Sequence, residues 1–157
     1  MESHGEGGFV PLELADRGRR LAGAVIDMVF QMAVGLPVLL LLGLAPDIWN
    51  PGGLDLLEKL RLASAGWLSY LLLHGWLLHT RGQTIGKWIV GTRIVDMDGQ
   101  VPPLARVMLL RLMLLGVVST ALPAMGWALS LFNVLLIFRA DRRCLHDHIA
   151  GTRVVHV

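Results

Sequence analysis

One apolar run near the start of the chain limits what it can fold into. Residues 21–44 read LAGAVIDMVFQMAVGLPVLLLLGL and carry a single formal charge, Asp27. A helix needs about 20 apolar residues to cross the hydrocarbon core of a bilayer, so this run is long enough for one span. The 157-residue chain is 54% hydrophobic and only 17% charged, which is few charges for a water-soluble surface. We therefore predict an all-α integral membrane protein surrounded by a lipid bilayer.

Two further apolar regions extend this prediction to a bundle of three to four transmembrane helices. Residues 62–79 have no formal charge apart from histidine protonation and are just long enough for a second span. The third region, residues 112–138, is too long for one untilted crossing and too short for two ordinary ones, and a helix that starts before it would extend the region to residues 107–138. Pro123 and Gly126 near its middle predict either one broken helix or two short helices.

The positions of the basic residues predict the orientation. Of the 14 lysines and arginines, all but Lys59 and Arg61 precede the first span, lie between the second and third, or follow the third. Loops rich in Lys and Arg stay in the cytoplasm, so we expect a multi-pass protein of the cell (inner) membrane with both termini cytoplasmic. No secretory signal peptide is expected, because the first twenty residues lack an apolar core. Residues 1–14 are expected to be a polar tail, followed by one membrane domain over residues 15–157.

A short sequence occurs twice in the segments assigned to the cytoplasm. Residues 89–95 read IVGTRIV and residues 149–155 read IAGTRVV. Each copy follows a short stretch compatible with a helix, which the glycine would end, and the β-branched residues after it favour a strand. Because an isolated strand leaves its backbone groups unpaired, we predict that the two TR strands pair with each other as a small two-stranded β element.

The first predicted helix has a polar face. At about 100 degrees per residue, Arg20, Gly23, Asp27 and Gln31 fall within one narrow stripe, with Ala24 and Gly35 at its margin. A charge at the centre of a membrane helix costs about 2.5–3.5 kcal/mol, so such residues normally face a partner or a watery cavity. Two interpretations stay open. In the structural one, Arg20 pairs with Asp27 or with a charge on another helix. In the functional one, Asp27 binds a cation or carries a proton, and the charge of Arg20 influences its protonation.

Several segments together resemble the RDD family of small membrane proteins. They are RLAGAVID at residues 20–27, GQTIGKWIVGTRIVDMDG at residues 82–99, Arg111, and LHDHIAGTRVV at residues 145–155. The resemblance covers nearly the whole chain and implies a multi-span membrane protein, with transport or cation/proton antiport suggested for some members. The family is named for an arginine and two aspartates, which by motif match are Arg20, Asp27 and Asp147, with Asp141 as the alternative to Asp147. The remaining motif positions are Gly82, Thr84, Gly86, Lys87, Arg111, His146, Gly151 and Thr152.

Other constellations are weaker. His146, Asp147 and His148 could begin a metal site, but adjacent residues do not share a helix face, so we expect no metal and no cofactor. Asp147 is more simply explained as a cap of the short helix before Gly151 or as a partner of a nearby arginine, with Arg20 the candidate. His74 lies deep in the second predicted span, either as a proton relay or as a neutral histidine bonded to a neighbouring helix.

These residues leave two hypotheses for function. The first is a small transporter or ion-translocating subunit in which Asp27 carries a cation or proton, working as a homo-oligomer because few helices leave little room for a pathway in one copy. The second is a binding or assembly module that docks another membrane protein. No catalytic set can be assembled from the chain, so we do not expect an enzyme, and its basic residues do not gather into a nucleic-acid site.

Overall fold

The computed structural model describes residues 13–44, 53–113, 116, 128–129, 131–133 and 135–157. Within this part of the chain the elements follow one another as α1 (Arg17–Leu41), α3 (Leu56–Arg81), α4 (Ile85–Ile89), β1 (Thr92–Asp96), α5 (Leu104–Arg106), the π-helical segment η2 (Val107–Met113), the 3-10 turn η3 (Leu136–Phe138), α8 (Leu145–Ala150) and β2 (Thr152–His156). The mostly helical architecture with one small sheet confirms that part of the predicted fold class.

Helix α1 contains most of the first predicted span. Its 25 residues are mostly apolar, and only two of them, Gly23 and Gly35, are buried by the rest of the protein. Large side chains such as Met28, Met32 and Leu40 are more than half exposed, as expected of a helix that faces lipid. Among the described residues, α1 alone combines the length and apolar composition needed to cross a membrane. One candidate span is therefore established by length and composition.

Helix α3 covers the second predicted span but begins earlier. Asp55 starts it with a capping box, in which its side chain accepts from the Glu58 backbone and the Glu58 side chain accepts from Asp55 N–H. Gly82 ends it in the left-handed conformation, at φ 64°. The second span remains a prediction from sequence. The third predicted span begins with η2. Residues 117–127, which include Pro123 and Gly126, lie outside the described residues.

The two repeated strands pair with each other, which confirms the prediction from the repeat. β1 and β2 are antiparallel, and Ile94 lies opposite Val154 at the centre of the register. Their outer edges are also covered. Ala15 N–H donates to the Val154 carbonyl at 3.0 Å on one side, and Ile94 N–H donates to the Gly82 carbonyl at 2.8 Å on the other. The sheet therefore presents no long open edge to another chain.

The segment before α1 belongs to this sheet as well. Leu14 bridges to Val155, and the Glu13 carbonyl accepts from His156 N–H at 3.0 Å. The polar tail predicted over residues 1–14 therefore overlaps the folded module at its last two positions, because their backbone groups extend the sheet. Residues 1–12 lie outside the described residues.

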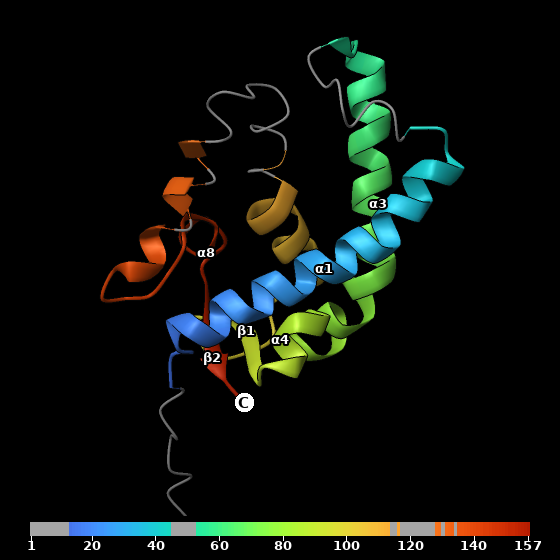
Figure 1. Ribbon diagram of the computed structural model, residues 1–157. Helices are drawn as coiled ribbons and strands as arrows, with labels where there is room; N and C mark the ends of the chain where they lie inside the picture. Colours follow the sequence, from blue (N-terminus) through green and yellow to red (C-terminus); the bar gives the residue numbers. More distant parts are fainter. Residues whose placement is uncertain (1–12, 45–52, 114–115, 117–127, 130, 134) are drawn as a thin grey trace, which may run out of the picture.

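A small apolar core fastens the sheet to one end of α3. Its buried members come from the segment before α1, from α3, from both strands and from η2: Ala15, Leu78, Ile94, Val107, Met108 and Val154. Figure 1 shows the result, with α4 and the two strands gathered at the lower end of α3 beneath the N-terminal half of α1. We call the unit formed by α4, β1, α8 and β2 the paired-repeat module.

Candidate functional site

The polar stripe predicted on α1 faces the rest of the protein. Its first three residues, Arg20, Gly23 and Asp27, pack against the paired-repeat module, and Gln31 contacts α3. Arg20 and Asp27 are seven residues apart, two helical turns along the same face. Arg20 reaches the second repeat, at α8, and Asp27 reaches the first repeat, at α4. Gly23 lies between them and is buried. The helix therefore holds one ionic residue against each copy of the repeat.

Asp27 accepts hydrogen bonds from the first turn of α4. Its Oδ1 accepts from Gly86 N–H at 2.7 Å, and its Oδ2 accepts from the Thr84 hydroxyl at 2.5 Å. The ammonium of Lys87 lies 3.6 Å from Oδ2, at an ion-pair distance. The Asp27 side chain keeps 14% of its surface exposed. The carboxylate thus accepts two short hydrogen bonds and has the Lys87 ammonium at a longer distance.

Glycines allow α1 and α4 to approach this closely. A Cβ on Gly86 would overlap the carbonyl oxygen of Gly23 and stand 2.8 Å from Asp27 Oδ1. A Cβ on Gly23 would meet Val90 at 3.2 Å. The two glycines therefore bring the α4 backbone within reach of the Asp27 carboxylate.

His74 lies on α3 next to the same carboxylate. It is fully buried, its Nδ1 accepts from Ile85 N–H at 3.3 Å, and the same nitrogen lies 4.0 Å from Asp27 Oδ1. Tyr70 packs against the ring with centroids 4.7 Å apart. Nε2 is buried and has no hydrogen-bond partner among the described residues. An accepting Nδ1 leaves the proton on Nε2, so the ring is neutral in this arrangement, and both roles predicted for His74 start from that form.

Arg20 forms an ion pair with Asp147 and not with Asp27. Its Nη2 lies 2.6 Å from Asp147 Oδ2, with 7% and 0% of the two side chains exposed. Nη1 donates to the Arg142 carbonyl, and Nη2 also contacts the sulfur of Cys144. Asp147 Oδ2 accepts from Cys144 N–H at 3.1 Å and so caps α8. Both roles expected of Asp147, a helix cap and a partner of Arg20, are present in the structure.

The two ionic contacts occupy equivalent places in the repeat. Each residue of the first copy has its counterpart 60 positions later, and the paired residues Ile94 and Val154 are such counterparts. The sheet register therefore relates the two copies by an approximate two-fold axis. Lys87 and Asp147 are also counterparts, each at the third position of its short helix. Helix α1 thus supplies the carboxylate of the ion pair with the first copy and the guanidinium of the ion pair with the second copy.

The other predicted site residues fall into three groups. Gln31 donates to the Ser69 hydroxyl at 2.7 Å and connects α1 to α3 within the apolar region. Thr152 and His146 both lie next to Asp147. The Thr152 hydroxyl is 3.4 Å and His146 Nε2 is 3.6 Å from Asp147 Oδ1. The backbone glycines are Gly82 and Gly151, which end α3 and α8. The side chain of Arg111 lies outside the described residues.

One group of side chains has the atoms of a metal site. Cys144, His146 and Asp147 place one ligand atom each within 4.8 Å of one another. The guanidinium of Arg20 contacts both the Cys144 sulfur and the Asp147 carboxylate. A divalent cation at this position would have to displace that positive charge, so the group does not fit a metal site in this arrangement.

Sequence reasoning missed the partners of Asp27. Thr84 and Lys87 were family-motif positions without an assigned contact, and their distance from Asp27 in the chain gave no sign of it. Asn133, whose side-chain oxygen lies 2.8 Å from His146 Nδ1, was not singled out. The signal that could have found the first contact was Gly86, because a glycine inside a short helix suggests a close backbone approach.

A helical membrane protein whose first helix holds two copies of a helix–strand unit is the class that this fold defines. The RDD family model matches residues 14–151, and the chain belongs to the RDD family of membrane proteins. The chain is also 34% identical over 137 residues to a Bacillus subtilis (strain 168) protein called "Uncharacterized protein YckC", covering 87% of this chain and 81% of that protein. No solved structure matches the chain.

Proposed function

We propose that this RDD protein is a transporter, not an enzyme, that exchanges a monovalent cation for protons at Asp27. The observation that carries the proposal is the geometry of the carboxylate. Asp27 is partly exposed, faces an ammonium at 3.6 Å and lies beside a buried histidine. An intramembrane carboxylate with an exchangeable positive partner is the usual element of ion and proton pathways.

The two carboxylates on the α1 interface differ in how firmly they are held. Asp147 is fully buried, pairs with the Arg20 guanidinium at 2.6 Å and caps a helix. A mobile cation therefore cannot replace the guanidinium at this carboxylate. Asp27 has 14% of its side chain exposed, and its ionic partner lies beyond hydrogen-bond distance. Of the two, Asp27 is the carboxylate that a mobile cation can reach.

Lys87 provides a built-in competitor for the transported cation. Its Nζ lies 3.6 Å from Asp27 Oδ2 and 3.4 Å from the Thr84 hydroxyl oxygen. A carboxylate and a hydroxyl are oxygen ligands of the kind that hard cations prefer. A monovalent cation entering beside these oxygens would replace the ammonium charge for charge, and protonation of Asp27 would release it.

His74 extends the site toward the interior of the bundle. Its ring is fully buried, with Nδ1 4.0 Å from Asp27 Oδ1 and Nε2 unpartnered among the described residues. An imidazole can accept a proton at one nitrogen and donate one at the other. His74 is therefore the group on the described helices that could pass a proton between Asp27 and an acceptor next to Nε2.

The same proposal includes a multi-pass topology with both termini in the cytoplasm. The sheet holds the segment before α1, the segment after α3 and the C-terminal strand together, so these three lie on one side of any bilayer that α1 crosses. Most of the basic residues lie in or next to these segments, as cytoplasmic segments do. We also expect a homo-oligomer, because the exposed apolar faces of α1 and α3 leave no closed pathway within the described part of one chain.

The test is ion exchange by the full chain in liposomes. Wild type and Asp27→Asn are reconstituted with a pH-sensitive dye inside and challenged with Na⁺, Li⁺ or K⁺ gradients. Asparagine keeps an oxygen for Gly86 N–H and can donate to Thr84, so the fold should survive while the charge is lost. We expect cation-driven pH changes with wild type and the signal of protein-free liposomes with Asp27→Asn.

The matched control is Asp98→Asn, which removes a carboxylate from the exposed turn after β1. This variant should exchange cations as fast as wild type. Equal, background-level signals from wild type, Asp27→Asn and the control under all three cation gradients would overturn the proposal.

A second candidate function is an assembly module that docks another membrane protein. It is favoured by the fact that both Asp27 oxygens already accept short hydrogen bonds, as they would if the residue only fastened α1 to α4. In that case Asp27→Asn lowers the yield of folded protein, or of a co-purifying partner, without any flux to lose. Recovery of wild type from native membranes with no stoichiometric partner counts against this candidate.

A further inference from the structure

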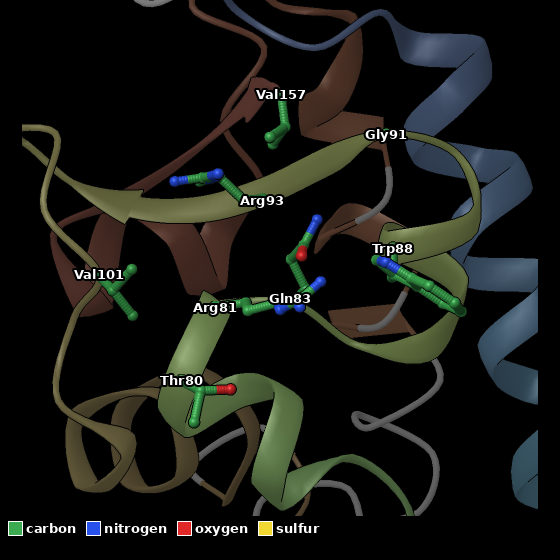
Figure 2. Close-up of a pocket in the computed structure, with 8 residues that line it drawn as sticks. All are labelled: Thr80, Arg81, Gln83, Trp88, Gly91, Arg93, Val101 and Val157. Atoms are coloured by element: carbon green, nitrogen blue, oxygen red, sulfur yellow. The ribbon is translucent and has the colours of Figure 1, made fainter.

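A cavity of about 420 Å³ opens where α3 ends and the paired-repeat module begins. Figure 2 shows Thr80 and Arg81 on the end of α3 at one side, Arg93 on β1 at the opposite side, and Trp88 at one end. This cavity is separate from Asp27, which does not line it. We propose that it binds the phosphate group of an anionic phospholipid from the cytoplasmic leaflet.

The charge of the cavity favours an anion. Arg81 and Arg93 both line it, and none of the described lining residues has an acidic side chain. The main-chain carboxylate of Val157, with an oxygen 3.8 Å from where a Cβ on Gly91 would stand, adds one negative charge against these two guanidinium groups. No ion pair joins either arginine to a carboxylate in the described part of the chain. Arg19 adds a third guanidinium nearby, with Nη1 3.9 Å from where a Cβ on Gly91 would stand. Guanidinium groups bind phosphate oxygens through paired N–H donors.

Arg93 also has an unfilled hydrogen-bonding capacity. Its Nε is buried and has no hydrogen-bond partner among the described residues. A buried N–H of a charged group without an acceptor is costly, so such a donor calls for an acceptor such as a water, an ion or a ligand. Arg153, the counterpart of Arg93 in β2, also has a buried Nε without a partner among the described residues, but it does not line the cavity. The amide N–H₂ of the neighbouring Gln83 donates to the Thr92 carbonyl at 2.8 Å, and no described oxygen, that of the Gln83 amide included, accepts from Arg93 Nε. A phosphate oxygen in the cavity would satisfy Arg93.

The surroundings favour a lipid over a soluble phosphate compound. Trp88 lines the cavity and is 54% exposed, the adjacent Ile89 is equally exposed, and Trp76 on α3 is 77% exposed. Exposed tryptophans next to basic residues are typical of the level of the lipid headgroups. Basic pockets at helix ends on the cytoplasmic side are suited to anionic headgroups, because that leaflet carries the negative lipids. The acyl chains would then lie along the exposed apolar side chains of α3.

The inference requires that the protein resides in a membrane with this end of α3 in the cytoplasm. It does not require cation exchange at Asp27. The two proposals can therefore fail separately: Asp27→Asn should leave lipid binding intact, and loss of the arginines should weaken lipid binding whatever the flux.

The experiment is native mass spectrometry of the detergent-purified full chain titrated with dioleoylphosphatidylglycerol or dioleoylphosphatidylcholine. We expect phosphatidylglycerol adducts that persist at activation energies where phosphatidylcholine is lost. The Arg81→Gln/Arg93→Gln double variant should bind phosphatidylglycerol at least about tenfold more weakly, given the contribution of each basic residue to binding an anionic lipid. Arg106→Gln, an exposed arginine of α5 outside the cavity, is the matched control and should bind as wild type does.

Two further measurements keep the result decisive. Arg81→Gln alone, on an exposed position, is included in case the change at Arg93 disturbs the strand, and should weaken binding in the same direction. Inorganic phosphate and glycerol 3-phosphate are added as competitors at millimolar concentration. Competition by these tail-free anions to completion would overturn the lipid assignment in favour of a soluble phosphate ligand. Equal binding of the two lipids, or unchanged binding by both arginine variants, would overturn the site itself.

Discussion

At the residue scale, the Arg20–Asp147 pair shows how an ionic contact can be structural inside a protein of this kind. Both side chains are almost entirely withdrawn from solvent, and each has further hydrogen-bond partners besides the other. Burying two charges gains little net energy compared with an apolar pair, but removing one of them leaves the other uncompensated. The pair therefore specifies how α1 sits on α8 more than it adds to stability.

Arg20→Gln should accordingly destabilise the protein strongly. The variant removes the guanidinium that pairs with the buried Asp147 carboxylate, and breaking a buried ion pair in this way costs about 3–5 kcal/mol. The measurement is unfolding of the purified protein in detergent by added denaturing surfactant, followed by circular dichroism. Arg19→Gln, one residue earlier on the exposed side of α1, is the control and should shift the midpoint little. Similar midpoints for the two variants would contradict the structural role assigned to the pair.

At the element scale, the contact between α1 and α4 depends on a pair of glycines that lets the two helix backbones approach each other directly. Gly23 and Gly86 face each other, and the Asp27 carboxylate reaches the first turn of α4 only because of that approach. The two short helices α4 and α8 are used differently by α1, although they are counterparts in the repeat. A carboxylate meets α4 beside Lys87, and a guanidinium meets α8 at Asp147.

Gly86→Ala should separate α1 from α4. The added methyl group would overlap the Gly23 carbonyl, so backbone has to move, at a cost of about 1–3 kcal/mol. Gly66→Ala provides the comparison, because a Cβ at this α3 position meets nothing within 4 Å and alanine favours a helix. Thermal unfolding in detergent should place Gly86→Ala below wild type and Gly66→Ala at or above it. If Gly86→Ala unfolds at the wild-type temperature, the close approach does not exist in solution.

At the scale of the whole molecule, the sheet ties three distant segments of the chain together at one end of α3. It takes its backbone partners from residues near 14, 94 and 154, which places both ends of the described chain beside each other. The buried core beneath the sheet is small, so most of the apolar surface of α1 and α3 remains outside. Such a distribution suits a membrane protein, because the apolar surfaces of α1 and α3 can contact lipid while the paired-repeat module lies next to the membrane.

The orientation can be measured with single cysteines. The native Cys144 is buried and starts α8, so Cys144→Ser should preserve the helix cap and supply a cysteine-free background. Cysteine introduced at Asp98, in the exposed turn after β1, should react with a membrane-impermeant maleimide only after the cells are permeabilised. Labelling of intact cells at this position would place the paired-repeat module outside and would reject the cytoplasmic assignment.

The sequence alone determined the parts of this protein that depend on local composition and periodicity. The apolar run of the first helix, its polar stripe at residues 20, 23, 27 and 31, and the pairing of the repeated strands all follow from regular spacing or from the need to pair exposed backbone. Only the tertiary structure decided which partner each charge on α1 would take. Arg20 and Asp27 are equally compatible with each other and with any charge on another segment, so spacing within one helix cannot choose between them. The choice was made by the sheet register and by the close approach of α4 at Gly86, which bring Asp147 and Thr84 to α1 from more than fifty residues away.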